Sequence, residues 1–159
     1  MTREQFVSNV EASQEAFRRF LTALCCGDTA LADDLAQEAY LKAYLSISSN
    51  INIEKFRAWI FKIGYNTFIN HKRSERYTED YLEATAIAST DSADSSFAYQ
   101  DLYEALNKIP PRERSSLLLF YMQGYSIKEI AEIQDISQEA VKQHLFRGRN
   151  HLRLLLTKN

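Results

Sequence analysis

The stretch from residue 125 to residue 149, YSIKEIAEIQDISQEAVKQHLFRGR, has the pattern of two short helices joined by a tight turn. Ser126 and Ser137 stand where the two helices would begin, and serine there can cap free backbone N–H groups. Apolar residues recur at positions 127, 130 and 131, and small Ala131 would allow the helices to cross closely. This pattern predicts a helix-turn-helix, whose second helix enters the DNA major groove.

Short amphipathic helix pairs also occur in bundles that never bind nucleic acid, so spacing alone leaves two interpretations open. The composition of the second helix favours DNA, because Glu139 is the only acid between Ser137 and the C-terminus. Solvated helices usually mix charge signs, whereas a surface of hydrogen-bond donors suits phosphates and base edges. The candidate DNA contacts are Ser137, Gln138, Lys142, Gln143, His144, Arg147 and Arg149.

Charge is unevenly distributed along the 159 residues, although the formal net charge is only −2. Residues 55–76 carry six Lys or Arg and one acid, and residues 108–159 carry nine Lys or Arg and five acids. Residues 77–107 between them carry seven acids and no Lys or Arg. Two basic blocks separated by an acidic block fit two contact surfaces on one polyanion.

With only four Gly and two Pro, the chain is expected to form long helices and an all-α fold. Helices are predicted over residues 4–24, 30–47, 54–74, 99–108 and 112–123, followed by the helix-turn-helix. The buried side of the helix over residues 30–47 is expected to comprise Leu31, Leu35, Ala39, Leu41, Tyr44 and Leu45.

Residues 77–98 are rich in Ser, Thr, Ala and acids, and they show little periodicity. They are therefore expected to be a flexible linker between a domain of residues 1–76 and a domain of residues 99–159. A loop is expected over residues 48–52, before the third helix.

The remaining composition argues against several classes of protein. Cys25 and Cys26 are the only cysteines and fit the end of a packed helix in a reducing cytoplasm. The three His show no metal-ligand spacing, so neither a metal nor another cofactor is expected. There is no nucleophile–base pair or phosphate-binding glycine loop, so an enzyme is not expected. No run approaches a membrane span and no signal peptide is recognisable, which predicts a cytoplasmic protein without membrane insertion.

Two earlier helices carry further candidate surfaces. Acids and an amide crowd one side of the helix over residues 30–47, either as a solvated face or as a docking surface for a basic partner. In the helix over residues 54–74, aromatic and amide groups alternate with bases, as in surfaces that bind unpaired nucleobases. Phe56 and Trp59 are better read as core, whereas the roles of Tyr65, Asn66 and Asn70 stay open on physical grounds.

Three stretches together resemble one family, the extracytoplasmic-function (group four) sigma factors of bacterial RNA polymerase. ADDLAQEAYLKAY resembles the family's acidic motif, and FRAWIFKIGYN resembles its F-R-x-W-L-x-x-I-A-x-N motif. The stretch from Ile109 to Arg149 resembles its L-P-x-x-x-R motif followed by the family's helix-turn-helix. Each motif alone is moderately specific, but all three in this order cover nearly the whole chain.

The resemblance implies a protein with two helical domains (sigma domains 2 and 4) and no enzymatic activity. The first domain would bind the β′ clamp helices of core polymerase through Asp33, Asp34, Leu35, Gln37 and Glu38. It would also bind the melted minus-ten promoter element through Asn50, Arg57, Trp59, Lys62, Tyr65, Asn66 and Asn70. The second domain would bind the β flap and read the minus-thirty-five element with the donor surface of its second helix. The acidic linker would lie in the RNA exit path, and a separate anti-sigma factor would be a further partner.

The chain departs from the family pattern at several positions. The family often has Ala at the position of Gly64, and Arg at the positions of Tyr65 and His144, so the promoter sequence does not carry over. Gly148 stands in mid-helix, where it is expected to permit close approach to a backbone. Two other functions remain possible: a conventional helix-turn-helix regulator that binds DNA alone, and a sigma-like decoy that occupies polymerase without using promoters.

Overall fold

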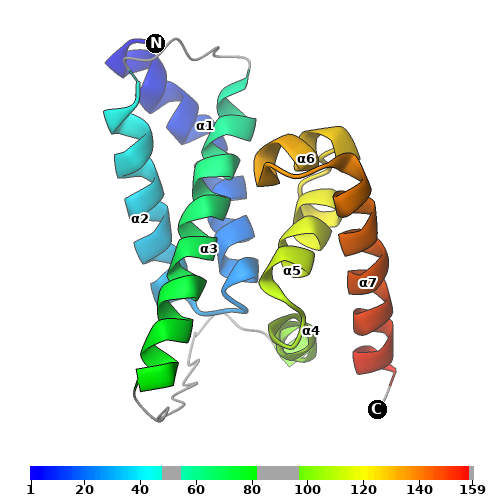
Figure 1. The fold of residues 1–159 in the computed structure, drawn as a ribbon. Helices are drawn as coiled ribbons and strands as arrows, with labels where there is room; N and C mark the ends of the chain where they lie inside the picture. Colours follow the sequence, from blue (N-terminus) through cyan, green and yellow to red (C-terminus); the bar gives the residue numbers. More distant parts are fainter. Residues whose placement is uncertain (48–54, 82–96, 158–159) are drawn as a thin grey trace.

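A computed structural model describes residues 1–47, 55–81 and 97–157, and these ranges contain helices and no strand (Figure 1). The all-α prediction is therefore confirmed. The predicted loop with Asn50, and most of the predicted linker, lie outside the described residues. The elements in chain order are α1 (Arg3–Leu24), α2 (Thr29–Leu45), α3 (Phe56–Tyr81), α4 (Phe97–Asn107), α5 (Pro111–Leu117), the π-helical turn η2 (Leu118–Met122), α6 (Ile127–Gln134) and α7 (Gln138–Leu156).

Helix α3 is longer than the sequence predicts, because it continues past residue 74 to Tyr81. No Gly or Pro occurs between Gly64 and Pro110 to stop it. Glu75 accepts from both Lys72 and His71 at 3.0 Å, and such pairs three and four residues apart support a helix. The predicted linker therefore begins inside a helix, and α4 likewise begins at Phe97, before residue 99.

Helices α1, α2 and α3 pack together, and α2 does so through a stripe of small residues. Its buried residues are Ala32, Leu35, Ala36, Ala39 and Ala43. Small side chains on one face allow close approach to the neighbouring helices.

The predicted burial of Leu41, Tyr44 and Leu45 is wrong. These side chains are 59%, 41% and 72% exposed. Ala39 and Ala43 occupy the face of α2 that turns inward, so the larger apolar residues between and beyond them lie outside it.

Two turn residues at the end of α1 connect it to α2. Cys26 and Gly27 have φ angles of 54° and 92°, a left-handed turn that ends α1. Asp28 then caps α2 by accepting from the Leu31 N–H at 3.1 Å.

Cys25 and Cys26 are free thiols at the end of a packed helix, and burial raises the pKa of Cys25 to about 12. Cys25 is therefore a neutral core side chain at physiological pH.

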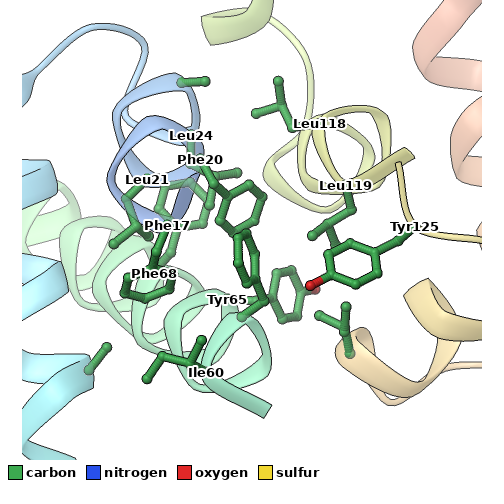
Figure 2. Close-up of a cluster of buried hydrophobic side chains, with 14 of the residues drawn as sticks. Phe17, Phe20, Leu21, Leu24, Ile60, Tyr65, Phe68, Leu118, Leu119 and Tyr125 are labelled. Atoms are coloured by element: carbon green, nitrogen blue, oxygen red, sulfur yellow. The ribbon is translucent and has the colours of Figure 1, made fainter. Parts of the chain in front are cut away.

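The two groups of helices share one hydrophobic core. Figure 2 shows Phe17 and Phe20 of α1 beside Phe68 of α3, with Leu119 and Tyr125 approaching from the second domain. Phe61 of α3 meets Tyr125 edge to face, with ring centroids 5.6 Å apart. The domains are therefore packed directly against each other in this structure.

Arg114, at 2% exposure, carries a buried charge across this boundary. Its guanidinium donates to the carbonyls of Leu106 at 2.8 Å and Ile109 at 3.1 Å, which lie at and after the end of α4. It also donates to the carbonyl of Leu24 at 2.6 Å, where the negative end of the α1 dipole lies. One side chain thus binds α5 to the ends of two helices, one from each domain.

Gly64 of α3 lies directly against the Phe17 ring. A Cβ added at Gly64 would stand 2.4 Å from Phe17 Cε1, and Phe17 is fully buried. The packing of α1 against α3 at this point therefore leaves no room for a Cβ.

Replacing Gly64 with alanine is expected to lower the free energy of unfolding. Alanine favours the helix by about 1 kcal/mol, but overpacking a core costs up to about 3 kcal/mol, and the fully buried Phe17 ring places this site at that upper end, so we expect a net loss of about 2 kcal/mol. Urea unfolding followed by circular dichroism measures this loss. Asn66→Ala, at an exposed position of the same helix, is the control, because it adds no atoms to the core. A Gly64→Ala variant as stable as the wild type would contradict the packing argument.

Replacing Arg114 with methionine keeps an apolar stem but removes the charged donor. Because hydrogen bonds to charged groups contribute about 1.5–3 kcal/mol each, we expect a loss of roughly 3 kcal/mol or more in unfolding free energy. Arg112→Met, at an exposed position of the same helix, is the matched control. Equal unfolding midpoints in urea for the two variants would refute the role given to Arg114.

Candidate nucleic-acid interface

Helices α6 and α7 form the predicted helix-turn-helix, and side chains fix both of its beginnings. Ser126 Oγ accepts from the Glu129 N–H at 3.1 Å, while Glu129 Oε1 accepts from the Ser126 N–H at 3.0 Å. Ser137 Oγ accepts from the Ala140 N–H at 3.1 Å. Asp135 ends α6 in the left-handed conformation with a φ of 56°. These caps fix where α6 and α7 begin, and the left-handed Asp135 fixes where α6 ends.

Most of the predicted donors project from α7 into solvent. Ser137, Gln138, Lys142, Gln143, Arg147 and Arg149 are exposed, and Val141 and Leu145 anchor the opposite face. Lys142 meets Glu139 at 3.4 Å, a surface pair that contributes little to stability. Arg149 donates to the Tyr121 hydroxyl at 3.1 Å, which orients its guanidinium.

Two residues of α7 differ from the simple outward pattern. His144 is half-buried, its Nδ1 lies 3.4 Å from Ser116 Oγ, and burial lowers its pKa. It is therefore neutral at physiological pH. Gly148 does permit a close approach, but its neighbour is the Leu117 side chain rather than a backbone.

The residues predicted for single-stranded DNA occupy two different faces of α3. Trp59, Lys62, Asn66 and Asn70 recur at spacings of three and four and share one face. On that face Asn66 and Asn70 are exposed, while Trp59 and Lys62 are half-buried. Trp59 also packs edge to face on buried Phe56, with ring centroids 5.5 Å apart.

Arg57 and Tyr65 lie on the face of α3 that meets the second domain. Arg57 Nη2 donates to Gln123 Oε1 at 3.1 Å, and Gln123 Nε2 in turn donates to the Ala16 carbonyl at 3.3 Å. Tyr65 is only 4% exposed, and burial raises the pKa of its hydroxyl. In this arrangement both side chains are engaged by the protein itself.

The predicted polymerase contacts on α2 also divide into two sets. Asp34, Gln37 and Glu38 are exposed on one side of the helix, and Glu38 meets Lys42 at 3.3 Å. Asp33 pairs with Arg18 of α1 at 2.7 Å. Leu35 is 2% exposed and belongs to the core, so it packs α2 against the neighbouring helices.

This surface has an apolar extension that was not predicted from the sequence. Leu41 and Leu45 follow Asp34, Gln37 and Glu38 at spacings of three and four, and both are exposed. The stripe of small residues on the opposite face could have predicted this exposure. A helix that packs against its neighbours through alanines has its remaining leucines on the solvent-facing side.

The described ranges contain neither a candidate metal cluster nor a candidate membrane span. No group of three His, Cys, Asp or Glu side chains gathers there in a way that could hold a metal ion. Among the helices of those ranges, none is long and apolar enough to cross a bilayer.

Comparisons with protein families match both halves of the chain. The family model described as Sigma-70 region 2 matches residues 10–78, and the model described as Sigma-70, region 4 matches residues 99–152. The first match contains α2 and most of α3, and the second contains the helix-turn-helix.

Individual relatives extend this match over nearly the full length. The ECF RNA polymerase sigma factor SigM of Bacillus subtilis is 28% identical over 88% of this chain and 88% of its own length. EcfG of Rhodopseudomonas palustris is 28% identical over 93% of this chain and 83% of its own.

Solved structures show the same fold. The sigma factor RpoE of Bartonella quintana, solved with the anti-sigma factor NepR, matches with a TM-score of 0.77 and 26% identity, covering 97% of this chain and 98% of its own. CnrH, solved with the cytosolic domain of CnrY, matches with a TM-score of 0.70 and 22% identity, covering 98% of this chain and 89% of its own. On the family matches to both halves and these relatives, the chain belongs to the extracytoplasmic-function group of the sigma-70 family of RNA polymerase sigma factors.

Proposed function

We propose that this sigma factor directs promoter-specific initiation through three surfaces. The acidic face of α2 binds core polymerase, the amide-rich face of α3 holds the melted minus-ten element, and the outward side of α7 reads the minus-thirty-five duplex. Residues 1–76 and 99–159 act as its two functional domains, with residues 77–98 between them. The observation that carries the proposal is the combination of an exposed donor helix and a separate exposed acidic helix in one short chain.

The α2 surface suits a partner that presents arginine side chains. Asp34, Gln37 and Glu38 place two carboxylates and an amide on one exposed side, and charge-assisted hydrogen bonds to guanidinium groups are strong. Leu41 and Leu45 add apolar area next to these charges, as expected where a polar rim adjoins a contact that excludes water. Asp33 is held by Arg18 and is the weakest of the candidate contacts.

In this structure the two domains are packed against each other, and we call this the closed arrangement. It supports a polymerase-dependent mechanism. Arg57 and Tyr65 contact or face the second domain, so the minus-ten face is incomplete until the domains separate. Binding of each domain to a different part of polymerase would supply the free energy for separation. A conventional regulator that binds duplex DNA alone gains nothing from the α2 and α3 surfaces.

Several properties follow from this function. The chain acts by binding, in the cytoplasm, and not as an enzyme. An anti-sigma factor is its natural regulator, as the anti-sigma factor bound to the solved relative suggests. Such a partner would act by favouring the closed arrangement of the domains.

Reversing charge on α2 tests the polymerase surface. Asp34→Lys with Glu38→Lys would place ammonium groups opposite basic partners, and we expect the affinity for core polymerase to fall at least about a hundredfold. Fluorescence anisotropy of labelled protein with core enzyme measures this affinity. Glu11→Lys, at an exposed site on α1, is the control.

Polymerase binding by the α2 variant, duplex binding by the free wild type and transcription assays together separate the alternatives. Unchanged polymerase binding by the double variant would reject the proposed surface. Tight binding of duplex operators by the free wild type would favour a conventional regulator. Polymerase binding without transcripts from any genomic promoter would indicate a decoy.

Truncating Arg147 tests the minus-thirty-five surface. If its guanidinium reads a base edge, Arg147→Ala should cost about 1–3 kcal/mol at the preferred promoter and relax selectivity at one upstream base pair. Run-off transcription from a library of single-base promoter variants measures both effects. Arg153→Ala, exposed further along α7, is the matched control. Equal transcript profiles for the two variants would argue against this role.

A further inference from the structure

A basic cleft lies between the two domains and borders the donor surface of α7 at His144 and Arg147. It has a volume of about 710 Å³ and is lined by the C-terminal half of α3, the junction of α4 and α5, and α7. Its lining contains seven Lys or Arg residues and two carboxylates. The cleft is within the size range of small-molecule sites.

The bases come from both sides of the domain boundary. Lys72, Arg73 and Arg76 belong to α3, whereas Lys108, Arg112 and Arg147 belong to the second domain. Closure of the domains therefore brings like charges together, which destabilises the closed arrangement unless an anion lies between them.

The two carboxylates of the lining are already engaged. Glu75 accepts from Lys72 Nζ and His71 Nε2, and Glu113 Oε1 lies 3.0 Å from His151 Nδ1. In the described part of the chain, no ion pair involves Arg73, Arg76, Lys108, Arg112 or Arg147. Within the described residues, the cleft thus holds five cationic side chains that form no ion pair with a carboxylate.

We propose that this cleft binds a multivalent phosphate anion, of the class of inorganic or nucleoside polyphosphates, which holds the two domains together. Guanidinium groups match phosphoryl oxygens in pairs, and a chain of phosphates can reach bases on both sides. A monovalent anion carries one charge and would leave most of these bases without a counter-charge. Anion binding itself does not depend on the proposed promoter contacts. Its expected effect on function rests on the role proposed for Arg147, because a bound anion would keep Arg147 from DNA.

The test compares two double variants that remove the same charge. Arg76→Gln with Arg112→Gln takes one exposed base from each wall of the cleft, and neither residue has a proposed promoter contact. Arg3→Gln with Lys128→Gln removes two exposed bases elsewhere. Circular dichroism first establishes that both variants are folded.

Isothermal titration with sodium tripolyphosphate, without magnesium and at constant ionic strength, measures binding to the full chain. The wild type and the Arg3/Lys128 variant should bind one anion each, and the Arg76/Arg112 variant should bind at least about tenfold more weakly. Tripolyphosphate should also slow hydrogen exchange in α3 and α5 of the wild type. Equal affinities of the two double variants would overturn the site, and unchanged exchange would overturn the role in holding the domains.

Two further titrations identify the chemistry. Adenosine triphosphate binding as tightly as tripolyphosphate would support recognition of the phosphate chain, and tighter binding would support a nucleoside polyphosphate. Sulfate binding as tightly as tripolyphosphate would indicate general charge screening and reject the proposal. Because no polymerase or DNA is present, failure here would leave the proposed initiation function untouched.

Discussion

The buried guanidinium of Arg114 is the contact on which the closed structure depends. A charge removed from water must be fully hydrogen-bonded, and here backbone carbonyls from α1 and from the α4–α5 connection meet that demand. The carbonyl of Leu24 lies in the other domain, so the bond is retained only while the domains are packed. The Phe61–Tyr125 contact and the Gln123 bridge then complete one boundary made of both apolar and polar contacts.

Local signals were sufficient for most of the fold. The serine caps and the helical spacing of apolar residues are set by neighbouring residues, and the structure places the caps as expected at Ser126 and Ser137. Helix α3 extends past the predicted end at residue 74 because the polar residues 75–81 include no Gly or Pro that would stop a helix. The burial of Leu41 and Leu45 was misjudged because hydrophobicity alone does not say which face of α2 is turned inward.

The candidate site shows where reasoning from sequence ends. Residue types and order indicate α2, α3 and α7 as candidate contact surfaces. They could not reveal that Arg57 and Tyr65 would face another domain while Asn66 and Asn70 stay exposed, because that depends on packing between segments far apart in the chain. The basic cleft could not be predicted either, because tertiary structure places Arg76 and Arg112, which are far apart in sequence, in the lining of one cleft.

The division of α3 into an open and a covered face has a quantitative consequence. A protein whose binding-competent form is a minor population shows an affinity reduced by the fraction in that form. If the separated form were about 1% of the free chain, its apparent affinity for melted promoter DNA would be about a hundredfold weaker than its intrinsic affinity. The bonds of Arg114, Arg57 and Gln123 would then set a threshold: stray single strands would rarely be engaged, and changes at the domain boundary would tune promoter use without touching a DNA contact.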